Sequence, residues 1–293
     1  MKDIVKSITP PLFYTFFSKM YKKSFSKRKT SKNQFQEDRN FNYIPLWHII
    51  KGGVLNGREF LVDTKDGYWQ REIVEGTYDD FFFNYLNKLN LEGKAIFEIG
   101  AHIGYHAMNF AVLVGEKGQI IAFEPNIHNR ERFKLNLSKN KDLESRIKLH
   151  DMAVSNSNGE VEFNFSEDVD NGKSSGSFIM GAHTPYALDV YKQIGFKKAK
   201  IKSITLDNFI NNYAHGVIPF LIKIDVEGAE NYVLEGSINT IKSFKPIILI
   251  EVHSIINMLK TCDFFYSLNY KIDLLKEEPD GRCFIVATHN ILE

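Results

Sequence analysis

The chain has 293 residues, of which 43% are apolar and 13% aromatic, and its formal net charge is +1. This length and apolar content suffice to bury a full hydrophobic core, so we expect one main domain with additions. The balanced charge gives no indication of a nucleic-acid partner, and no run of roughly 18 apolar residues predicts a membrane-spanning helix. Cys262 and Cys283 lie in apolar runs and are expected to be reduced core residues of a cytoplasmic protein.

The N-terminal region departs from this balance of charge. Residues 1–32 contain nine Lys or Arg residues and a single acid, Asp3, with aromatic residues interleaved. Pro10 and Pro11 interrupt the apolar part and no small-residue cleavage site follows, so we do not expect a signal peptide. A basic aromatic helix can lie on an anionic membrane surface, or it can pack on its own domain or on a partner. We expect such a helix and a linker over residues 1–37, with peripheral contact at the inner face of the membrane as one interpretation.

Residues 38–90 are expected to form a small β and helix extension. Two apolar segments, 54–55 and 60–62, flank Asn56-Gly57, which is a favoured two-residue hairpin turn, so residues 41–76 are predicted to be β structure. From Asp79 onward the apolar residues have helical spacing, and this pattern ends at Gly93. The remainder, residues 91–293, is expected to be the main domain, with a loop insertion over residues 166–198.

The stretch from residue 95 to 124 is predicted to form a strand, a glycine turn, a helix and a second strand. An acid ends the apolar run of each strand, Glu98 in the first and Glu124 in the second. In an open parallel sheet the C-terminal ends of the strands form the ligand crevice. Both carboxylates are therefore expected in that crevice.

The glycine spacing discriminates between nucleotide-like ligands. A dinucleotide fold uses G-x-G-x-x-G, but His102 and Tyr105 stand where the second and third glycines would be. The pattern is instead E-x-G-x-x-x-G, from Glu98 to Gly104. A carboxylate repels a phosphate and suits a cationic amino group, and S-adenosylmethionine has an amino group, a ribose diol and no phosphate. The residues therefore favour S-adenosylmethionine over NAD, with Glu124 accepting both ribose hydroxyls.

Further contacts are predicted from the middle of the chain. A third strand over residues 147–150 places Asp151 near the adenine amine and Met152 against the ring, unless Asp151 only caps a turn. An alternating run from Gly159 predicts an extra strand, and the polar, glycine-rich residues 166–185 are typical of a lid or binding loop. The candidate substrate contacts are Tyr78, Ser175, Ser177 and His183.

Two later strands end in ionisable residues. A buried strand leads to Asp225 and Glu227, and the next strand carries Glu251 and His253 on one face. Lys223 shares a face with Asp225, and a lysine in an apolar strand needs an acidic partner, either Asp225 or Glu251. Ionisable side chains at two neighbouring strand ends indicate a functional site, with a structural ion-pair network as the alternative.

The C-terminal part completes the predicted sheet. Residues 255–268 are expected to be helical, with Ile256, Leu259 and Phe264 facing inward. Strands over residues 270–275 and 283–288 are joined by a Pro-Asp-Gly turn that suits an antiparallel hairpin. We therefore predict an α/β fold, a Rossmann-like, seven-stranded, mostly parallel sheet with an antiparallel last strand.

These motifs resemble those of the FkbM family of S-adenosylmethionine-dependent methyltransferases. The resemblance covers about residues 75–290, and its most specific part is the pair IKIDVEGAE and IEVH. It implies a class I methyltransferase fold and O-methylation, often of sugar or polyketide hydroxyls. The N-terminal ITPPLFY and the basic helix resemble family members associated with bacterial surface-glycan synthesis. The matching pieces are EGTYDDFF (75–82), FEIGAHIGYHA (97–107), IAFEPN (121–126), AVSNSNGEVEF (153–163), TLDNF (205–209), LIKIDVEGAE (221–230), VLEG (233–236) and KPIILIEVH (245–253).

Carried over by position, the resemblance implies a cofactor site around Glu98, Gly100, Gly104 and Glu124. Our full prediction of the residues that bind S-adenosylmethionine is Glu98, Gly100, Ala101, His102, Gly104, Tyr105, Glu124, Pro125, Asp151, Met152, Ala153 and Asp225. The predicted catalytic residues are Asp225, His253, Glu251, Lys223 and Glu227.

A sugar hydroxyl is a poor nucleophile at neutral pH, so a base should accelerate methyl transfer by about 10²–10⁴-fold. We predict that His253 or Asp225 is this base, His253 having the more suitable ordinary pKa. Asp225 could instead fix the cofactor amine or bind a divalent metal with Glu251. No metal-ligand spacing is specific enough, so no metal is predicted.

The predicted function is S-adenosylmethionine-dependent O-methylation of a sugar or glycan precursor in bacterial surface-polysaccharide synthesis. Three alternatives remain. The glycine spacing disfavours an NAD-dependent dehydrogenase. A protein that binds the cofactor without catalysis, and a methyltransferase acting on a polyketide, a small metabolite or a protein, stay open.

If the N-terminal helix lies on a membrane, deletion of residues 1–32 should abolish co-sedimentation with anionic liposomes, because the deletion removes the basic and aromatic side chains together. Neutral liposomes serve as the control for the full chain. Unchanged co-sedimentation of the shortened chain would rule out this contact.

Overall fold

The computed structural model describes residues 45–63, 68–166, 177–179, 196–279 and 281–289. All of these described residues belong to one compact unit. The expected N-terminal helix and a possible helix over residues 186–194 lie outside the described residues, as do Ser175 and His183. Within the described ranges, no helix has both the length and the apolar character needed to cross a membrane.

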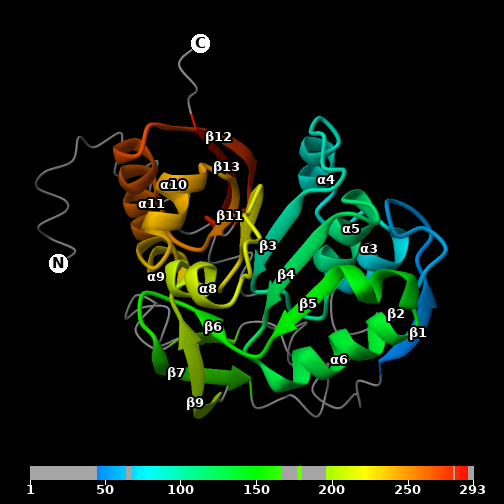
Figure 1. Cartoon of the computed structure of the whole chain (residues 1–293). Helices are drawn as coiled ribbons and strands as arrows, with labels where there is room; N and C mark the ends of the chain where they lie inside the picture. The colour runs from blue at the N-terminus through cyan, green and yellow to red at the C-terminus, as the bar shows by residue number, and fades with distance from the viewer. Residues whose placement is uncertain (1–44, 64–67, 167–176, 180–195, 280, 290–293) are drawn as a thin grey trace, which may run out of the picture. The chain divides into compact units, whose positions relative to one another are not determined.

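A seven-stranded sheet forms the centre of this unit, with the strand order β12-β13-β11-β10-β3-β4-β5 (Figure 1). The five strands β11, β10, β3, β4 and β5 are parallel to one another, and β13 is antiparallel to both β11 and β12. This topology confirms the predicted Rossmann-like sheet. The strands are β3 (Ala95–Ile99), β4 (Gln119–Phe123), β5 (Ile147–His150), β10 (Leu221–Ile224), β11 (Ile247–Val252), β12 (Tyr270–Glu277) and β13 (Cys283–His289).

Helices cover both faces of the sheet (Figure 1). One group comprises α3 (Tyr68–Glu75), α4 (Asp80–Leu86), α5 (Tyr105–Leu113), α6 (Ile127–Ser138) and the 3-10 helix η1 (Lys141–Arg146). The other group comprises α8 (Leu206–Asn212), α9 (Glu230–Glu235), α10 (Ile238–Phe244) and α11 (Ile255–Ser267).

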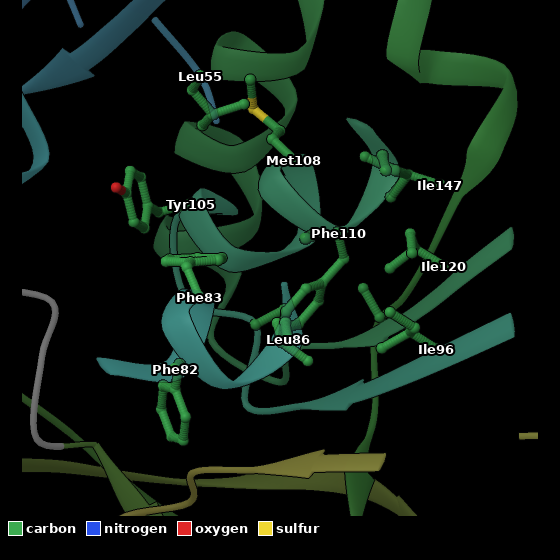
Figure 2. Close-up of a cluster of buried hydrophobic side chains, with 14 of the residues drawn as sticks. Leu55, Phe82, Phe83, Leu86, Ile96, Tyr105, Met108, Phe110, Ile120 and Ile147 are labelled. Atoms are coloured by element: carbon green, nitrogen blue, oxygen red, sulfur yellow. The ribbon is translucent and has the colours of Figure 1, made fainter. Parts of the chain in front are cut away.

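The two faces have separate hydrophobic clusters because side chains alternate along each strand. Ile96 and Ile120 point into the first cluster, where Figure 2 shows them beside Phe110 of α5. Their neighbours Phe97 and Ile121 point into the second cluster. The strands of the sheet are therefore buried on both sides, as continuous apolar runs require.

A second sheet, with the order β6-β9-β7-β8, lies beside the central one. Its strands are β6 (Ala153–Val154), β7 (Gly159–Ser166), β8 (Phe178–Ile179) and β9 (Phe196–Ile204). The alternating pattern from Gly159 predicted β7. β8 lies within the segment expected to be a loop, because its two residues become a strand only by pairing with β7.

The predicted hairpin around Asn56-Gly57 exists, but its first strand was placed wrongly. β1 (Leu46–Ile49) pairs antiparallel with β2 (Glu59–Val62), and residues 54–55 belong to the turn between them. Residues 68–75 were predicted to be β structure and form α3 instead. Gln70, Ile73 and Val74 are the buried residues there, a helical spacing that the polar residues between them obscured.

The inward face predicted for α11 was wrong. Ile256 is 52% exposed and Leu259 is 69% exposed. The buried residues are Asn257, Thr261 and Phe265, and Phe264 is only partly buried. Asn257 donates hydrogen bonds from Nδ2 to Gly228 O and to a carboxylate oxygen of Glu230, so the buried face of this helix combines polar contacts with the fully buried ring of Phe265.

Gly100 allows two strands to approach closely where β3 ends. Its φ is +87°, and a Cβ at this position would overlap the carbonyl oxygen of Asp225. Gly100 N donates to Phe123 O at 3.0 Å, and Asp225 N donates to Ile99 O at 3.0 Å. A glycine is therefore required both by the backbone conformation and by the space available.

Replacing Gly100 with alanine should lower the free energy of unfolding more than replacing Gly57, a matched control in the hairpin turn. Gly57 also has a positive φ, of +81°, but nothing lies within 4 Å of a Cβ there. Gly57→Ala should cost about 1–2 kcal/mol from conformation alone, and Gly100→Ala roughly a further 1–3 kcal/mol from the overlap. Urea unfolding followed by circular dichroism measures both, and equal losses would show that the close approach is unimportant.

Candidate active site

A cavity of about 450 Å³ lies at the C-terminal ends of β3, β4, β10 and β11. Its floor is made by residues that follow these strands, including Gly100, Glu124 and Asp225. Its walls come from α3, from the second sheet and from the hairpin between β12 and β13. It occupies the crevice in which an open parallel sheet binds its ligands.

Many of the predicted site residues meet at this cavity. Those that line it are Tyr78, Gly100, His102, Glu124, Pro125, Met152, Ala153, Ser177, Asp225, Glu227 and Glu251. Those that the structure describes but that do not line it are Glu98, Ala101, Gly104, Tyr105, Asp151, Lys223 and His253.

Asp151 points away from the cavity. Its side chain is 53% exposed and forms an ion pair with Lys202 Nζ at 3.1 Å. Met152, the next residue along the chain, faces the cavity instead. The predicted adenine contact of Asp151 therefore does not match the orientation of its carboxylate.

Three predicted cofactor residues around the first turn are packed into the protein. Tyr105 is 5% exposed, and its ring makes edge contacts with Phe60 and Tyr78. Gly104 begins α5 with a φ of +89°, and a Cβ there would overlap the ring of Phe133. Ala101 is 2% exposed. These three residues therefore pack against the protein beneath the turn and do not line the cavity.

Glu124 is a buried carboxylate held in place by backbone donors. Its Oε2 accepts from His102 N and its Oε1 accepts from Asn126 N, both at 2.8 Å. Burial raises the pKa of Glu124 to about 6, although these hydrogen bonds oppose the rise. Each carboxylate oxygen can accept more than one hydrogen bond, so Glu124 can also accept hydrogen bonds from the hydroxyl groups of a ligand in the cavity.

Glu98 lies beneath the cavity and is fully buried. Its Oε1 lies 3.8 Å from Lys223 Nζ, because the two residues are opposite each other on β3 and β10. Burial raises the pKa of Glu98 to about 8, against the effect of Lys223. Glu98 stands one residue before the end of β3. Its side chain therefore points to the same face of the sheet as Ile96, which α5 covers, and not into the cavity.

Lys223 connects Glu98 to the floor of the cavity. Its Nζ donates to Asp225 Oδ2 at 3.1 Å, which gives this buried lysine the acidic partner expected from the sequence. Burial alone would raise the pKa of Asp225, but Lys223 and His253 hold it well below its usual range. Lys223 therefore orients the carboxylate of Asp225 and keeps it ionised, although Lys223 itself does not line the cavity.

His253 lies directly behind the carboxylates that line the cavity. Its Nε2 lies 3.5 Å from Glu227 Oε2, 3.6 Å from Glu251 Oε1 and 4.0 Å from Asp225 Oδ1. On the other side of the ring, Nδ1 lies 2.7 Å from Glu230 Oε1. Burial alone would lower the pKa of His253, but the hydrogen bond with Glu230 and the carboxylates raise it to about 10.

Glu230 is a site residue that the sequence analysis missed. It is fully buried, and its Oε1 also accepts from Gly228 N at 2.7 Å. Its Oε2 accepts from Asn257 Nδ2 at 2.6 Å. An acid at the first position of a helix is typical of an ordinary helix start, so its spacing from His253 carried no separate signal.

Glu227 and Glu251 both line the cavity but have different partners. Glu251 accepts from Arg282 Nη1 at 2.6 Å, and burial together with Asp225 raises its pKa to about 8. Burial also raises the pKa of Glu227. Among the residues that the structure describes, Glu227 forms an ion pair with His253 and none with a lysine or arginine.

Three residues that line the cavity have unusual backbone conformations. Asp79, His102 and Glu227 have φ values of +53°, +50° and +51°, which is uncommon for residues other than glycine. Such conformations cost roughly 1–3 kcal/mol each and cluster at functional sites. They are independent support for a functional cavity.

The walls contain further residues that sequence reasoning missed. Trp69 of α3 lines the cavity, and its ring centroid lies 5.5 Å from that of His102. Lys276 and Arg282, from the hairpin between β12 and β13, also line it. The Pro-Asp-Gly turn indicated the hairpin, but nothing in its sequence indicated which strand ends it would face.

Comparisons with known proteins identify the domain. The sequence model of the Methyltransferase FkbM domain matches residues 98–272. Hexuronic acid methyltransferase AglP of Haloferax volcanii is 27% identical over 199 residues, which cover 67% of this chain and 70% of that protein.

Two solved structures match parts of the chain. Methyltransferase FkbM from Methylobacillus flagellatus KT is 18% identical with a TM-score of 0.48, and the match covers 74% of this chain and 52%, about half, of that one. Aeropyrum pernix fibrillarin with bound S-adenosyl-L-methionine is 13% identical with a TM-score of 0.44, covering 86% and 85% of the two chains.

Substitution of Glu124 with glutamine should weaken binding of S-adenosylmethionine roughly 10- to 100-fold, the effect of losing hydrogen bonds to a charged acceptor. Because the pKa of Glu124 is raised to about 6, its charge is present above this pH and is lost below it. Affinity of the unsubstituted protein should therefore fall between about pH 7.5 and about pH 5, and that of Glu124→Gln should change less.

Isothermal titration calorimetry at both pH values measures these affinities. Asp151→Asn is the matched control, because it removes an exposed carboxylate outside the cavity and should leave binding unchanged. Unaltered affinity in Glu124→Gln would exclude Glu124 as a ligand contact.

Proposed function

Since the chain belongs to the FkbM family of methyltransferases, we propose that this enzyme uses S-adenosylmethionine to methylate a hydroxyl group of a sugar or glycan precursor. The observation that carries the proposal is the meeting of Gly100, Glu124 and Asp225 around one cavity. These residues come from three different strands. Their meeting supports a donor site beside a cluster of ionisable groups.

The residues at the cavity fit the proposed donor. Gly100 leaves room where a side chain would overlap the backbone of Asp225. Glu124 has both oxygens fixed by backbone donors and faces the cavity, as recognition of a ribose diol requires. Met152 and Phe123 supply apolar surface for an adenine ring. We no longer propose a direct contact from Glu98, because its carboxylate lies beneath the floor.

When bound, S-adenosylmethionine supplies an activated methyl group, so the protein must orient the acceptor oxygen and take up the proton of its hydroxyl. We assign proton uptake to Glu227. Its raised pKa and its position on the cavity suit a general base, which works best with a pKa near the operating pH.

The two bases proposed from the sequence are less suited to this role. The pKa of Asp225 is held low by Lys223 and His253, so its carboxylate is a weak base. His253 carries a proton at neutral pH in this arrangement, since its pKa is raised to about 10.

The walls of the cavity support a polar, ring-shaped acceptor. Trp69 and Tyr78 offer aromatic faces, and Ser177 offers a hydroxyl group. Lys276 and Arg282 also line the cavity, but each is paired with an acid there, Glu278 and Glu251, so a hexuronic acid acceptor is supported by the named relative alone. A polyketide, a small metabolite or a protein acceptor is the alternative, and so is a protein that binds the donor without catalysis.

The acceptor can be identified by incubating the protein with isotopically labelled methyl donor and a panel of activated and lipid-linked sugars, including hexuronic acid derivatives. Mass spectrometry should detect label on a sugar hydroxyl. Donor binding without transfer to any member of the panel or to a glycan extract would support the non-catalytic alternative.

Glu227→Gln should lower the turnover number by about 10²–10⁴-fold, because the amide cannot accept the proton, while donor affinity stays unchanged. Asp151→Asn should keep full turnover, since this carboxylate lies outside the cavity. Initial rates at saturating donor, together with calorimetric donor binding, provide the measurement. Near-normal turnover in Glu227→Gln would assign proton uptake to another residue.

A further inference from the structure

We propose that Asp225, Glu251 and His253 bind a divalent metal ion of the Mg²⁺ or Mn²⁺ class at the floor of the cavity. The role of this ion in catalysis rests on the proposed function, whereas its binding does not. The three residues come from the ends of β10 and β11, which are neighbours in the sheet. Asp225 and Glu251 line the cavity, and His253 lies behind them.

The ligand atoms of these residues are close enough to share an ion. One ligand atom from each of the three lies within 4.8 Å of the others. His253 Nε2 is 3.6 Å from Glu251 Oε1 and 4.0 Å from Asp225 Oδ1. Around an ion with bonds of about 2.0–2.3 Å, ligand atoms lie roughly 3–4.5 Å apart. Closure by a few tenths of an ångström therefore completes the site.

The orientation of His253 is an independent observation that points to a ligand. Its side chain is 7% exposed, and Nε2 forms no hydrogen bond within the described part of the chain, although it faces the carboxylates. Nδ1 is hydrogen-bonded to Glu230, which is itself held by Gly228 N and Asn257 Nδ2. A carboxylate on one ring nitrogen fixes the tautomer that leaves the other nitrogen free to bind a metal. Glu230 is thus a positioning residue for His253.

The charges around His253 favour a divalent cation. Four carboxylates surround the ring, those of Asp225, Glu227, Glu230 and Glu251. Two of them have a cationic partner, since Lys223 pairs with Asp225 and Arg282 pairs with Glu251. Binding of an ion would displace the proton of His253 to solvent, and with the four carboxylates ionised two negative charges then remain for one divalent ion to balance.

The three metal ligands indicate which class of ion binds and what the ion does in the reaction. Two carboxylates and one imidazole suit Mn²⁺ or Mg²⁺ better than ions that require thiolates. Three protein ligands leave coordination positions that open toward the cavity. An acceptor hydroxyl bound there becomes more acidic, and Glu227 lies beside the same cluster, where it can receive the proton.

The proposal is tested by metal binding to the full-length chain after treatment with a chelator. Mn²⁺ is titrated in the absence of methyl donor, and the free ion is followed by electron paramagnetic resonance. We expect saturable binding of one ion per chain. Glu251→Gln and His253→Ala should each weaken binding by at least about tenfold, and Glu230→Gln by about 10- to 100-fold, although it touches no ion.

Asp151→Asn is the control and should bind Mn²⁺ as the unsubstituted chain does, because its carboxylate is exposed and remote from the cluster. Circular dichroism establishes that each variant is folded. Asp225→Asn serves as a second ligand variant should Glu251→Gln fail to fold. The absence of saturable binding, or equal binding in the ligand variants and the control, would overturn the proposal and leave a protonated His253 as the balancing charge.

Measurements of methyl transfer distinguish the metal-binding proposal from the proposed methyltransferase function. Methyl transfer that persists undiminished in excess chelator would overturn the catalytic metal and leave the methyltransferase assignment intact. Stoichiometric Mn²⁺ binding without methyl transfer to any acceptor would contradict the proposed function and leave the ion site intact.

Discussion

The buried ammonium group of Lys223 is the interaction on which the arrangement of the site depends. It lies within the central sheet, between Glu98 on β3 and Asp225 at the end of β10. A single charge in this position would be costly, and so would either carboxylate without the cation. Lys223 thus links the two neighbouring strands at the point where the Gly100 turn meets the ionisable cluster. The same lysine keeps Asp225 ionised at the floor of the cavity.

The central sheet could be predicted because its strands are buried on both faces and thus appear as continuous apolar runs. The elements that periodicity missed depend on contacts that are distant in sequence. β8 becomes a strand only beside β7. The apolar residues of α11 occur around most of the helix, so hydrophobicity alone could not select its buried face. The face that is buried combines the hydrogen bonds of Asn257 to Gly228 and Glu230 with the ring of Phe265, and both depend on tertiary contacts.

The candidate site could be predicted to the level of strand ends but not of side-chain direction. Glu124 follows the last residue of β4 and faces the cavity, whereas Glu98 precedes the last residue of β3 and is buried beneath it. A shift of one residue reverses the side of the sheet, and the sequence pattern did not locate the strand end that closely. Glu230 and Trp69 were missed because each lies on a helix whose relation to the cavity is a property of the tertiary structure.

The close approach of Gly100 to the backbone of Asp225 also bears on how the molecule can move. No side chain separates the two segments, and backbone hydrogen bonds tie both to β3 and β4. This packing makes the floor of the cavity a closely held platform, and in the proposed reaction such a platform would keep donor and acceptor aligned. Entry and exit of substrates must then depend on the walls, which α3, the second sheet and the hairpin between β12 and β13 contribute from outside the platform.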